Sequence, residues 1–399
     1  MTSPERFAAL WRSLAPIGNS PHGYHRLSWS YPDLACREWF AEEAADRGLT
    51  AETDGNGNLW GWLGDPAAGD AVVTGSHFDS VPGGGGYDGP LGIVSAFLAL
   101  DVLAERGVRL RRPIGVVAFT EEEGSRFGVA CLGSRLLTGA LDPERAAALR
   151  DRDGVTPVEA MKSGGVEPSL LGPDPLRLGR IGAFVELHIE QGRALTAPVG
   201  VASAIWPHGR WRLDFTGTGN HAGTTAMHQR HDPMLTFAYA VLVANKEARL
   251  RGGHATVGRV GVEPNATNAI PSRVTAWLDA RAPGQSTLDG LVSAIGTRIT
   301  DRAGRDGTAA TIEAESVSPL TEFHTGLRDR IVALLGGAPV LPTGAGHDAG
   351  VLAGHVPTAM LFVRNPTGVS HAPEEYATDV DCAAGVEALA AVLEELACR

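Results

Sequence analysis

Several features that mark disulfide-bonded, nucleic-acid-binding and membrane proteins are scarce in this sequence. Its four cysteines are scattered over 399 residues and form no CxxC pair. This pattern excludes a disulfide ladder and predicts a reducing compartment, the cytoplasm. Basic residues are in the minority, because 34 Lys and Arg stand against 46 Asp and Glu. The formal net charge of −12 argues against nucleic acid or an anionic membrane surface as partners.

Long apolar runs are missing as well. The longest, residues 91–104, contains Asp101 and is too short to cross a bilayer. Residues 1–15 lack a basic start followed by an apolar core, so we expect no signal peptide. The hydrophobic content of 43% and the charged content of 20% are typical of a soluble globular protein. A chain of this length predicts two domains.

Glycine, in contrast, is plentiful between two candidate metal ligands. Residues 71–74 are apolar or β-branched and predict a buried strand, which leads to His77 and Asp79. A glycine-rich loop then ends at Asp88, and a long apolar helix begins near residue 91. The histidine and the carboxylate therefore lie beside the C-terminal end of a strand, where open α/β sheets bind ligands. They predict a metal site; the alternative is a loop whose polar groups only cap the helix.

The position of Asp79 suggests a supporting role. In an extended segment, residues two apart point to the same side. Asp79 could therefore accept the second ring N–H of His77 and fix its tautomer.

Two further predicted strands end in polar groups. Residues 113–120 predict a buried strand that runs into the glutamates of residues 121–123, for which a solvated acidic loop is the alternative interpretation. Residues 183–190 alternate between apolar and polar, which places His188 on one face with two glutamates. Because strand–helix–strand order predicts a parallel sheet, we expect these strand ends to line one cleft.

Composition changes near Pro207, where a second group of elements begins. It contains predicted strands at 211–216, 256–262 and 273–280, and predicted helices at 233–250 and 286–302. These lengths suit a small α+β sandwich inserted into the first domain. After it, the chain returns to the first domain and carries two more polar clusters, around His347 and His371.

Seven motifs occur in a fixed order between about residues 54 and 376 and together are specific. They are GSHFDSVPGGGGYDG, TEEEGSRFG, VELHIEQG, GTGNHAGTT, NAIPSRV with LDAR, GAGHDA and SHAPEEY. The set resembles the N-carbamoyl-L-amino-acid hydrolase and allantoate amidohydrolase branch of the dinuclear-metal aminoacylase/carboxypeptidase clan. The resemblance implies two divalent metal ions per subunit and a lid domain that usually also forms a homodimer.

The predicted fold class is therefore α/β. We expect a mixed-sheet catalytic domain sandwiched by helices, formed by residues 1–206 and 320–399. Residues 207–319 would form the inserted smaller α+β sandwich, the lid or dimerisation domain.

The resemblance also implies a ligand set. Carried over by position, Asp88 would bridge the metals, His77 and His188 would complete one site, and Glu123 and His371 would complete the other. Nitrogen and carboxylate ligands suit zinc, manganese, cobalt or nickel, and the sequence does not choose among them.

A neighbouring glutamate is the implied general base. Glu122 and Glu123 directly precede Gly124, as in the family's EEG pattern, so the resemblance makes Glu122 the base and leaves Glu121 without a role. Histidine at position 188 favours the carbamoylase branch, since peptidase-like relatives carry a carboxylate there.

Five residues are implied to hold the substrate. Arg281 would bind an α-carboxylate bidentately, with a surface salt bridge as the alternative. His221, supplied by the partner subunit, would polarise the scissile carbonyl or its oxyanion. Asn268 and Gln191 would donate or accept amide hydrogen bonds, and His347 would lie near the site.

We therefore predict a metal-dependent amidohydrolase that cleaves the carbamoyl C–N bond of an N-carbamoyl-L-amino acid, a small-molecule substrate. Allantoate, β-ureidopropionate and other linear amides are alternative substrates, and a metal-binding module without catalysis is the remaining alternative. The substrate stays open because the sequence departs from the family at three places. These are Ala226, where proline is common, the bulky stretch 205–211 and the aromatic-rich loop 22–31.

Overall fold

The computed structural model describes residues 2–398 and divides the chain into two compact units. Unit 1 comprises Met1–Ala204 and Glu322–Arg399, and unit 2 comprises Ile205–Thr321. The division differs by two residues at each end from the predicted boundaries, 206/207 and 319/320. None of the helices within the described residues combines the length and the apolar character that crossing a bilayer requires.

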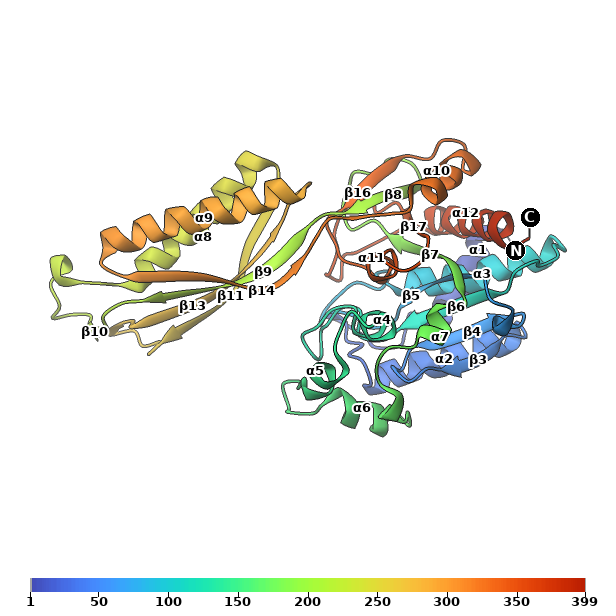
Figure 1. Ribbon diagram of the computed structural model, residues 1–399, viewed down its shortest axis with the longest axis horizontal. Helices are drawn as coiled ribbons and strands as arrows, with labels where there is room; N and C mark the ends of the chain where they lie inside the picture. Colours follow the sequence, from blue (N-terminus) through green and yellow to red (C-terminus); the bar gives the residue numbers. More distant parts are fainter. Residues whose placement is uncertain (1, 399) are drawn as a thin grey trace. The chain divides into compact units, whose positions relative to one another are not determined.

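Unit 1 is built on a mixed sheet, which confirms the predicted α/β class (Figure 1). Within residues 2–398, nine strands form this sheet in the order β15-β8-β17-β7-β5-β6-β4-β3, with β16 paired to β8. Its strands are β3 Thr50–Thr53, β4 Leu59–Leu63, β5 Ala71–His77, β6 Ile114–Phe119, β7 Ile181–Ile189, β8 Val199–Ile205, β15 Thr321–Glu322, β16 Val340–Thr343 and β17 Thr358–Val363. A separate two-stranded ribbon pairs β1 Asn19–Ser20 with β2 Gly23–Tyr24.

The helices of unit 1 connect these strands. They are α1 Ser3–Leu14, α2 Tyr31–Asp46, α3 Pro90–Glu105, α4 Leu132–Thr138, α5 Pro143–Ala148, α6 Pro157–Ser163, α7 Pro175–Leu178, α10 Thr325–Leu334, α11 Asp348–Leu352 and α12 Asp379–Ala397, with 3-10 turns η1 Pro66–Ala68 and η2 Pro168–Leu170. Helix α3 is apolar over most of its length and almost wholly buried, because it packs against both the sheet and α12. It lies between β5 and β6 in the sequence, after the loop 78–89, and the two strands pair in parallel, as the strand–helix–strand order predicts.

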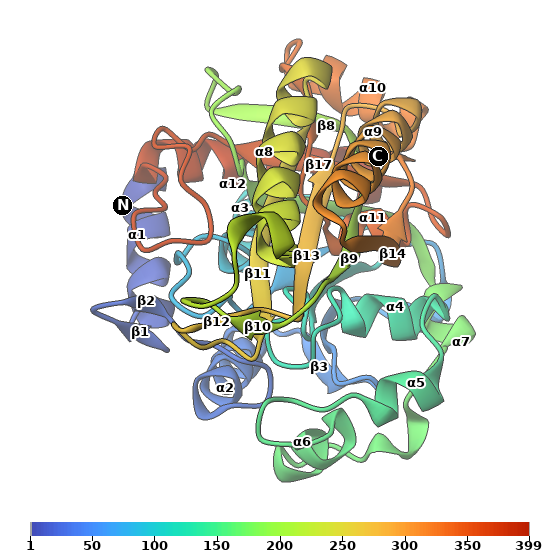
Figure 2. The same ribbon diagram turned by 90° about the vertical axis from the view of Figure 1, so that its left-hand side faces the viewer.

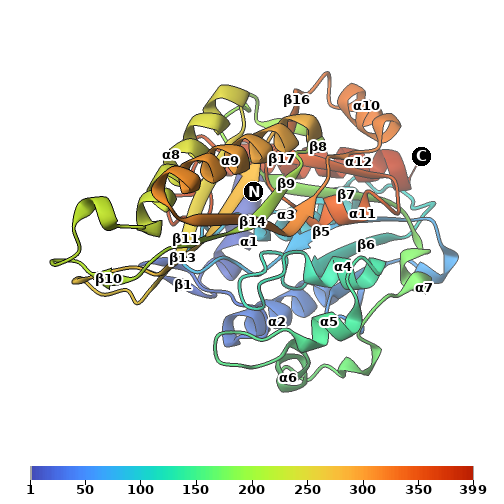
Figure 3. The same ribbon diagram turned by 60° about the vertical axis from the view of Figure 1, so that its left-hand side comes forward.

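Four central strands run in parallel and set the position of the candidate site. β17 pairs with β7, β7 with β5, and β5 with β6, each in parallel. Strands β5, β6 and β17 are buried at every residue, in keeping with their continuous apolar and β-branched sequences. Since parallel strands share one C-terminal edge, the segments that follow all four strands meet there (Figure 3).

Unit 2 is a smaller α+β sandwich. Its antiparallel sheet has the order β11-β13-β9-β14, with strands β9 His208–Thr216, β11 His254–Glu263, β13 Arg273–Arg281 and β14 Ala309–Ser318. Helices α8 Pro233–Arg251 and α9 Gln285–Asp306 cover one face of it (Figure 2). A short ribbon of β10 Asn220–His221 and β12 Ala269–Ile270 and the turn η3 Met227–Gln229 complete the unit. Alternate residues of β13 are buried against the helices, the pattern of a half-covered strand.

Candidate metal centre and active site

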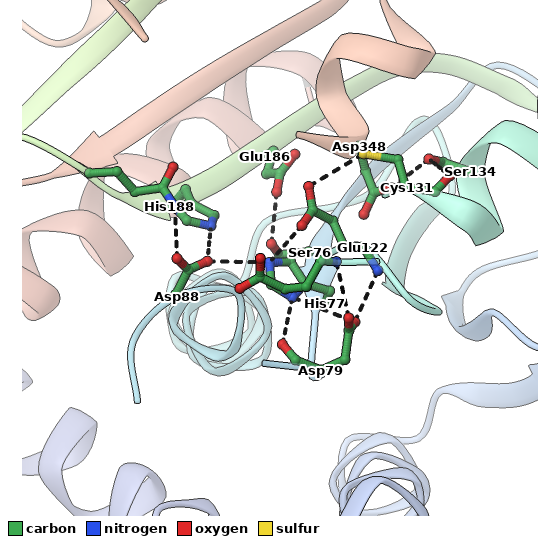
Figure 4. Close-up of polar contacts among 12 residues, drawn as sticks. Ser76, His77, Asp79, Asp88, Glu122, Cys131, Ser134, Glu186, His188 and Asp348 are labelled. Carbon is green, nitrogen blue, oxygen red and sulfur yellow. Dashed lines mark hydrogen bonds and ion pairs between the residues drawn. The ribbon is translucent and has the colours of Figure 1, made fainter. Parts of the chain in front are cut away.

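Asp88 and two histidines form the first group that could hold a metal ion. Asp88 Oδ1 lies 3.5 Å from His77 Nε2 and 3.1 Å from His188 Nε2 (Figure 4). His77 ends β5, His188 lies at the end of β7, and Asp88 immediately precedes Gly89 at the start of α3. All three side chains are buried. Their ligand atoms lie within 4.8 Å of one another, the spacing that a common metal ion requires.

Both rings present an unpaired nitrogen to this group. His77 Nδ1 donates to the main-chain carbonyl of Asp79 at 3.0 Å, and His188 Nδ1 donates to that of Ile189 at 2.8 Å. A carbonyl can only accept, so each Nδ1 carries a proton, and in the neutral ring the lone pair is on Nε2. Both Nε2 atoms are buried without a hydrogen-bond partner. The two histidines are thus held in the tautomer that ligates a metal.

The second group uses the other oxygen of Asp88. His371 Nε2 lies 3.3 Å from Asp88 Oδ2 and 3.4 Å from Glu123 Oε2. His371 follows β17 with φ of 58°, a left-handed backbone that costs energy for a non-glycine residue and is common at functional sites. Asp88 therefore faces one ligand group with each oxygen, as a carboxylate that bridges two metals must.

The charges of these groups perturb one another. Burial opposes ionisation of Asp88, but the three surrounding histidines hold its pKa well below the usual value. The hydrogen bond to Asp88 raises the pKa of His371 to about 9. Burial raises the pKa of Glu123 to about 7. The cluster thus concentrates negative charge, which favours the binding of protons or metal cations.

Two backbone features set the position of Asp88. Gly89 has φ of 84°, and a Cβ atom there would lie 2.5 Å from the His77 ring, so only glycine lets the chain pass over this ligand. Glu375 Oε1 accepts the main-chain N–H groups of Tyr87 and Asp88, both at 2.9 Å. Sequence reasoning did not assign Glu375 a role, although it lies four residues after His371 in the SHAPEEY motif.

The predicted hydrogen bond from the His77 ring to the Asp79 carboxylate is wrong. The main-chain carbonyl of Asp79 takes the ring N–H, and the carboxylate lies 3.7 Å from Nδ1. The physical reason is that β5 ends at His77, so the two-residue alternation of a strand does not continue to Asp79. The carboxylate instead accepts the N–H groups of Glu122 and Glu123, each at 3.1 Å. Asp79 therefore positions the segment that carries these glutamates.

The three consecutive glutamates are not a solvated loop. Glu121 and Glu122 are buried, and Glu123 is largely covered. Glu121 has φ of 56° and turns away from the cluster, where its carboxylate accepts the N–H groups of Arg126 and Phe127. Glu122 and Glu123, in contrast, face the histidines of the cluster.

Glu122 lies beside the first metal-ligand group but outside it. Its Oε2 is 3.7 Å from His77 Nε2, and its Oε1 is 3.4 Å from the thiol of Cys131. Burial raises the pKa of its carboxyl group well above the usual value. Such a group, close to the ligands and shielded from water, has the properties of a general base.

Two predicted substrate-binding residues also contact the residues of this cluster. Gln191 donates from Nε2 to Asp88 Oδ2 at 2.7 Å. The buried ring of His347 lies edge-on to His188, with centroids 4.6 Å apart, and its Nε2 has no hydrogen-bond partner. Glu186, His188 and His347 could form a further ligand group. Both oxygens of Glu186, however, already accept hydrogen bonds, from Ser76 Oγ and from the main-chain N–H of Ala349.

The other predicted substrate-binding residues belong to unit 2. Pairing of β10 with β12 brings His221 next to the Asn268 segment, whose carbonyl accepts the N–H of Ala222 at 2.9 Å. His221 is exposed, and its Nδ1 accepts the N–H groups of Gly223 and Thr224, so its Nε2 carries the proton and can donate.

Arg281 lies at the end of β13 and pairs with Asp279 of the same strand. Its Nε is 2.9 Å from Asp279 Oδ1, and its Nη2 is 3.2 Å from Oδ2. This is the surface salt bridge that the sequence left open as an alternative. It also shows that the guanidinium can bind a carboxylate with two parallel hydrogen bonds.

Comparison with known proteins shows similarity over almost the whole chain. The model for peptidase family M20/M25/M40 matches residues 73–395. The chain is 37% identical to the N-carbamoyl-L-amino acid amidohydrolase of Geobacillus stearothermophilus, over 100% of this chain and 99% of the relative. It is 34% identical to the allantoate amidohydrolase of Escherichia coli, over 96% of both chains. A solved amidase of the hydantoinase/carbamoylase family from Burkholderia vietnamiensis has a TM-score of 0.88 at 32% identity, with 98% of both chains covered.

Proposed function

Because the chain belongs to peptidase family M20/M25/M40, we propose that it is a metal-dependent hydrolase of linear amides. Its reaction would cleave the carbamoyl C–N bond of an N-carbamoyl-L-amino acid to give the amino acid, ammonia and carbon dioxide. The observation that carries the proposal is Asp88, which faces a histidine pair with one oxygen and the Glu123–His371 pair with the other. The full-length similarity to an N-carbamoyl-L-amino acid amidohydrolase supports the choice of substrate.

The cofactor would be a pair of divalent metal ions, zinc, manganese, cobalt or nickel. His77, His188 and Asp88 would hold one ion, and Asp88, Glu123 and His371 the other. The unpaired, buried Nε2 atoms of both buried histidines fit this role. When bound, the metals would supply Lewis acidity that lowers the pKa of water to near neutrality.

Glu122 would act as the general base. Its Oε2 faces the cluster, where it would take a proton from the attacking water and later pass it to the leaving nitrogen. Asp79 would position this step by holding the main-chain N–H groups of Glu122 and Glu123. Burial of Glu122 keeps bulk water away and strengthens its electrostatic interactions.

Five residues would bind the substrate or its oxyanion. The Nε2–H of His221 would stabilise the oxyanion of the tetrahedral intermediate, and the partner subunit of a homodimer formed through unit 2 would supply it. Arg281 would exchange Asp279 for the α-carboxylate of the substrate. Asn268, Gln191 and His347 would contribute further hydrogen bonds. The three buried cysteines, Cys36, Cys131 and Cys382, are free thiols, which supports a reducing, cytoplasmic location.

Allantoate is the second candidate substrate, because the chain is 34% identical to the E. coli allantoate amidohydrolase over almost its full length. Allantoate would present a ureido group and a carboxylate to the same residues. β-Ureidopropionate is a further candidate with the same two groups.

The test is ammonia release by the manganese- or zinc-loaded protein on N-carbamoyl-L-amino acids, allantoate and β-ureidopropionate, with chelator controls. We expect chelator-sensitive turnover of the carbamoyl amino acids, whereas turnover of allantoate alone would assign the second function. Glu122→Gln should keep both metals and lose at least about 100-fold in kcat, as expected for a general base. Undiminished turnover in Glu122→Gln would remove Glu122 from the mechanism.

A further inference from the structure

Cys131 lies against the carboxylate of Glu122 and has no role in the reaction described so far. It immediately precedes α4, and its main-chain N–H donates to the carbonyl of Glu122 at 2.7 Å. The next two residues continue this pairing, because the N–H groups of Leu132 and Gly133 donate to the carbonyls of Glu121 and Thr120. The start of α4 is thus fixed to the segment that carries the proposed base.

The side chain of Cys131 makes a second contact with the same glutamate. Its Sγ lies 3.4 Å from Glu122 Oε1, within hydrogen-bond range for sulfur (Figure 4). Within residues 2–398, no other side chain donates a hydrogen bond to this carboxylate. The two oxygens of Glu122 therefore differ, since Oε1 faces the thiol and Oε2 faces His77.

The thiol is a neutral donor at physiological pH. Cys131 is 4% exposed, and burial, assisted by the charge of Glu122, holds the pKa of its thiol well above the usual value. A neutral S–H is a weak donor. It can therefore fix the orientation of a carboxylate while weakening its basicity less than an amide or hydroxyl donor would.

We propose that Cys131 is a positioning residue for Glu122. Its S–H group holds Oε1 and so presents Oε2 to the metal-ligand cluster. The inference rests on the proposed function only for the role of Glu122 as base. Without this hydrogen bond, the carboxylate can rotate about its terminal bond and spends less time in the reactive orientation. The same helix turn holds a second buried carboxylate, since Ser134 Oγ donates to Asp348 Oδ1 at 2.5 Å.

The backbone of Cys131 determines which variants test this role. Its φ of 55° and ψ of 39° are left-handed, so a β-branched valine or threonine would add strain of its own. Cys131→Ala removes the donor, and Cys131→Ser keeps a donor in the same place. Cys36→Ala is the matched control, because it removes an equally buried thiol from α2.

Steady-state kinetics on the metal-loaded variants give the first readout. We expect Cys131→Ala to lower kcat roughly 3- to 10-fold with KM and metal content unchanged, as for loss of a weak donor to an anion. Cys131→Ser should recover most of this loss, and Cys36→Ala should keep the kcat of the original protein. Unchanged kcat in Cys131→Ala, or an equal loss in Cys131→Ser, would show that Cys131 only fills space.

Infrared spectroscopy gives a second readout that does not need activity. The S–H stretching band lies where other protein groups do not absorb, and it moves to lower frequency when the thiol donates a hydrogen bond. The difference between the original protein and Cys131→Ala assigns the band of Cys131. In Glu122→Gln, which has a weaker acceptor, this band should shift to higher frequency. A band that does not move would refute the hydrogen bond, whereas inactivity of the original protein on every substrate would instead refute the proposed function.

Discussion

Glu375 should control the metal affinity of the site although it is not a proposed ligand. Its Oε1 accepts the N–H groups of Tyr87 and Asp88 and thereby fixes the backbone of the bridging carboxylate. Glu375 is buried, and Gly85 leaves the space that its carboxylate occupies. Removing the side chain in Glu375→Ala would leave two main-chain donors without their acceptor.

The expected loss of stability in Glu375→Ala follows from these two hydrogen bonds. Each buried N–H group left unsatisfied costs about 1–3 kcal/mol, so Glu375→Ala should lower the free energy of unfolding of the metal-free protein by about 2–6 kcal/mol. Loss of a group that orients a metal ligand typically weakens metal binding about 10- to 100-fold. Glu375→Gln keeps an oxygen that can accept both N–H groups, and we expect less than about a fivefold loss of affinity for it.

Chelator competition with zinc or manganese would measure the affinity, and urea unfolding of the metal-free protein would measure the stability. Glu374→Ala is the matched control, because this neighbouring carboxylate is exposed. It should change neither quantity. If Glu375→Ala folds and binds both metals with unchanged affinity, the main-chain hydrogen bonds do not determine the position of Asp88.

Two other predictions concern the same cluster. The metal-free protein should lose stability as pH rises from 5 to 9. Glu121 and Glu123 each have a raised pKa of about 7 in the folded state. Between pH 4.5 and 7 the folded state therefore binds more protons than the unfolded state, and the free energy of unfolding falls as pH rises. His371 has a raised pKa of about 9, so the free energy of unfolding falls further as pH rises from 6.5 to 9. Thermal unfolding of the metal-free protein would measure this, and a midpoint that rises with pH would contradict the prediction. Gly89→Ala should abolish metal binding at the first group, because its Cβ would lie 2.5 Å from the His77 ring in a backbone with positive φ; equilibrium dialysis that still finds two metals per chain would contradict this.

The sequence predicted the parts of the site that depend on strand order. His77 and His188 lie at the ends of buried strands that the apolar runs identify, and parallel pairing then requires those ends to meet. The same pattern predicted the small sandwich of unit 2, since its strands alternate and its helices are long. The motifs supplied what strand order cannot, namely that Asp88 and His371 approach these strand ends from loops.

Side-chain partners within the loops could not be predicted in this way. The Asp79 prediction failed because it extended the alternation of a strand beyond His77, where the strand ends. Glu375 and Cys131 are separated from their partners by 287 and 9 residues, and both act at positions set by turns rather than by a periodic element. Such contacts depend on the direction in which each turn points one side chain, and the pattern of apolar residues does not predict that direction.

Asp79, Glu375 and Cys131 nevertheless share one property. Each forms a hydrogen bond to the segment or side chain of a predicted functional residue. Most buried polar groups in proteins have a hydrogen-bond partner. The hydrogen-bond partners of the buried carboxylates and main-chain N–H groups therefore identify supporting residues that a ligand motif does not contain.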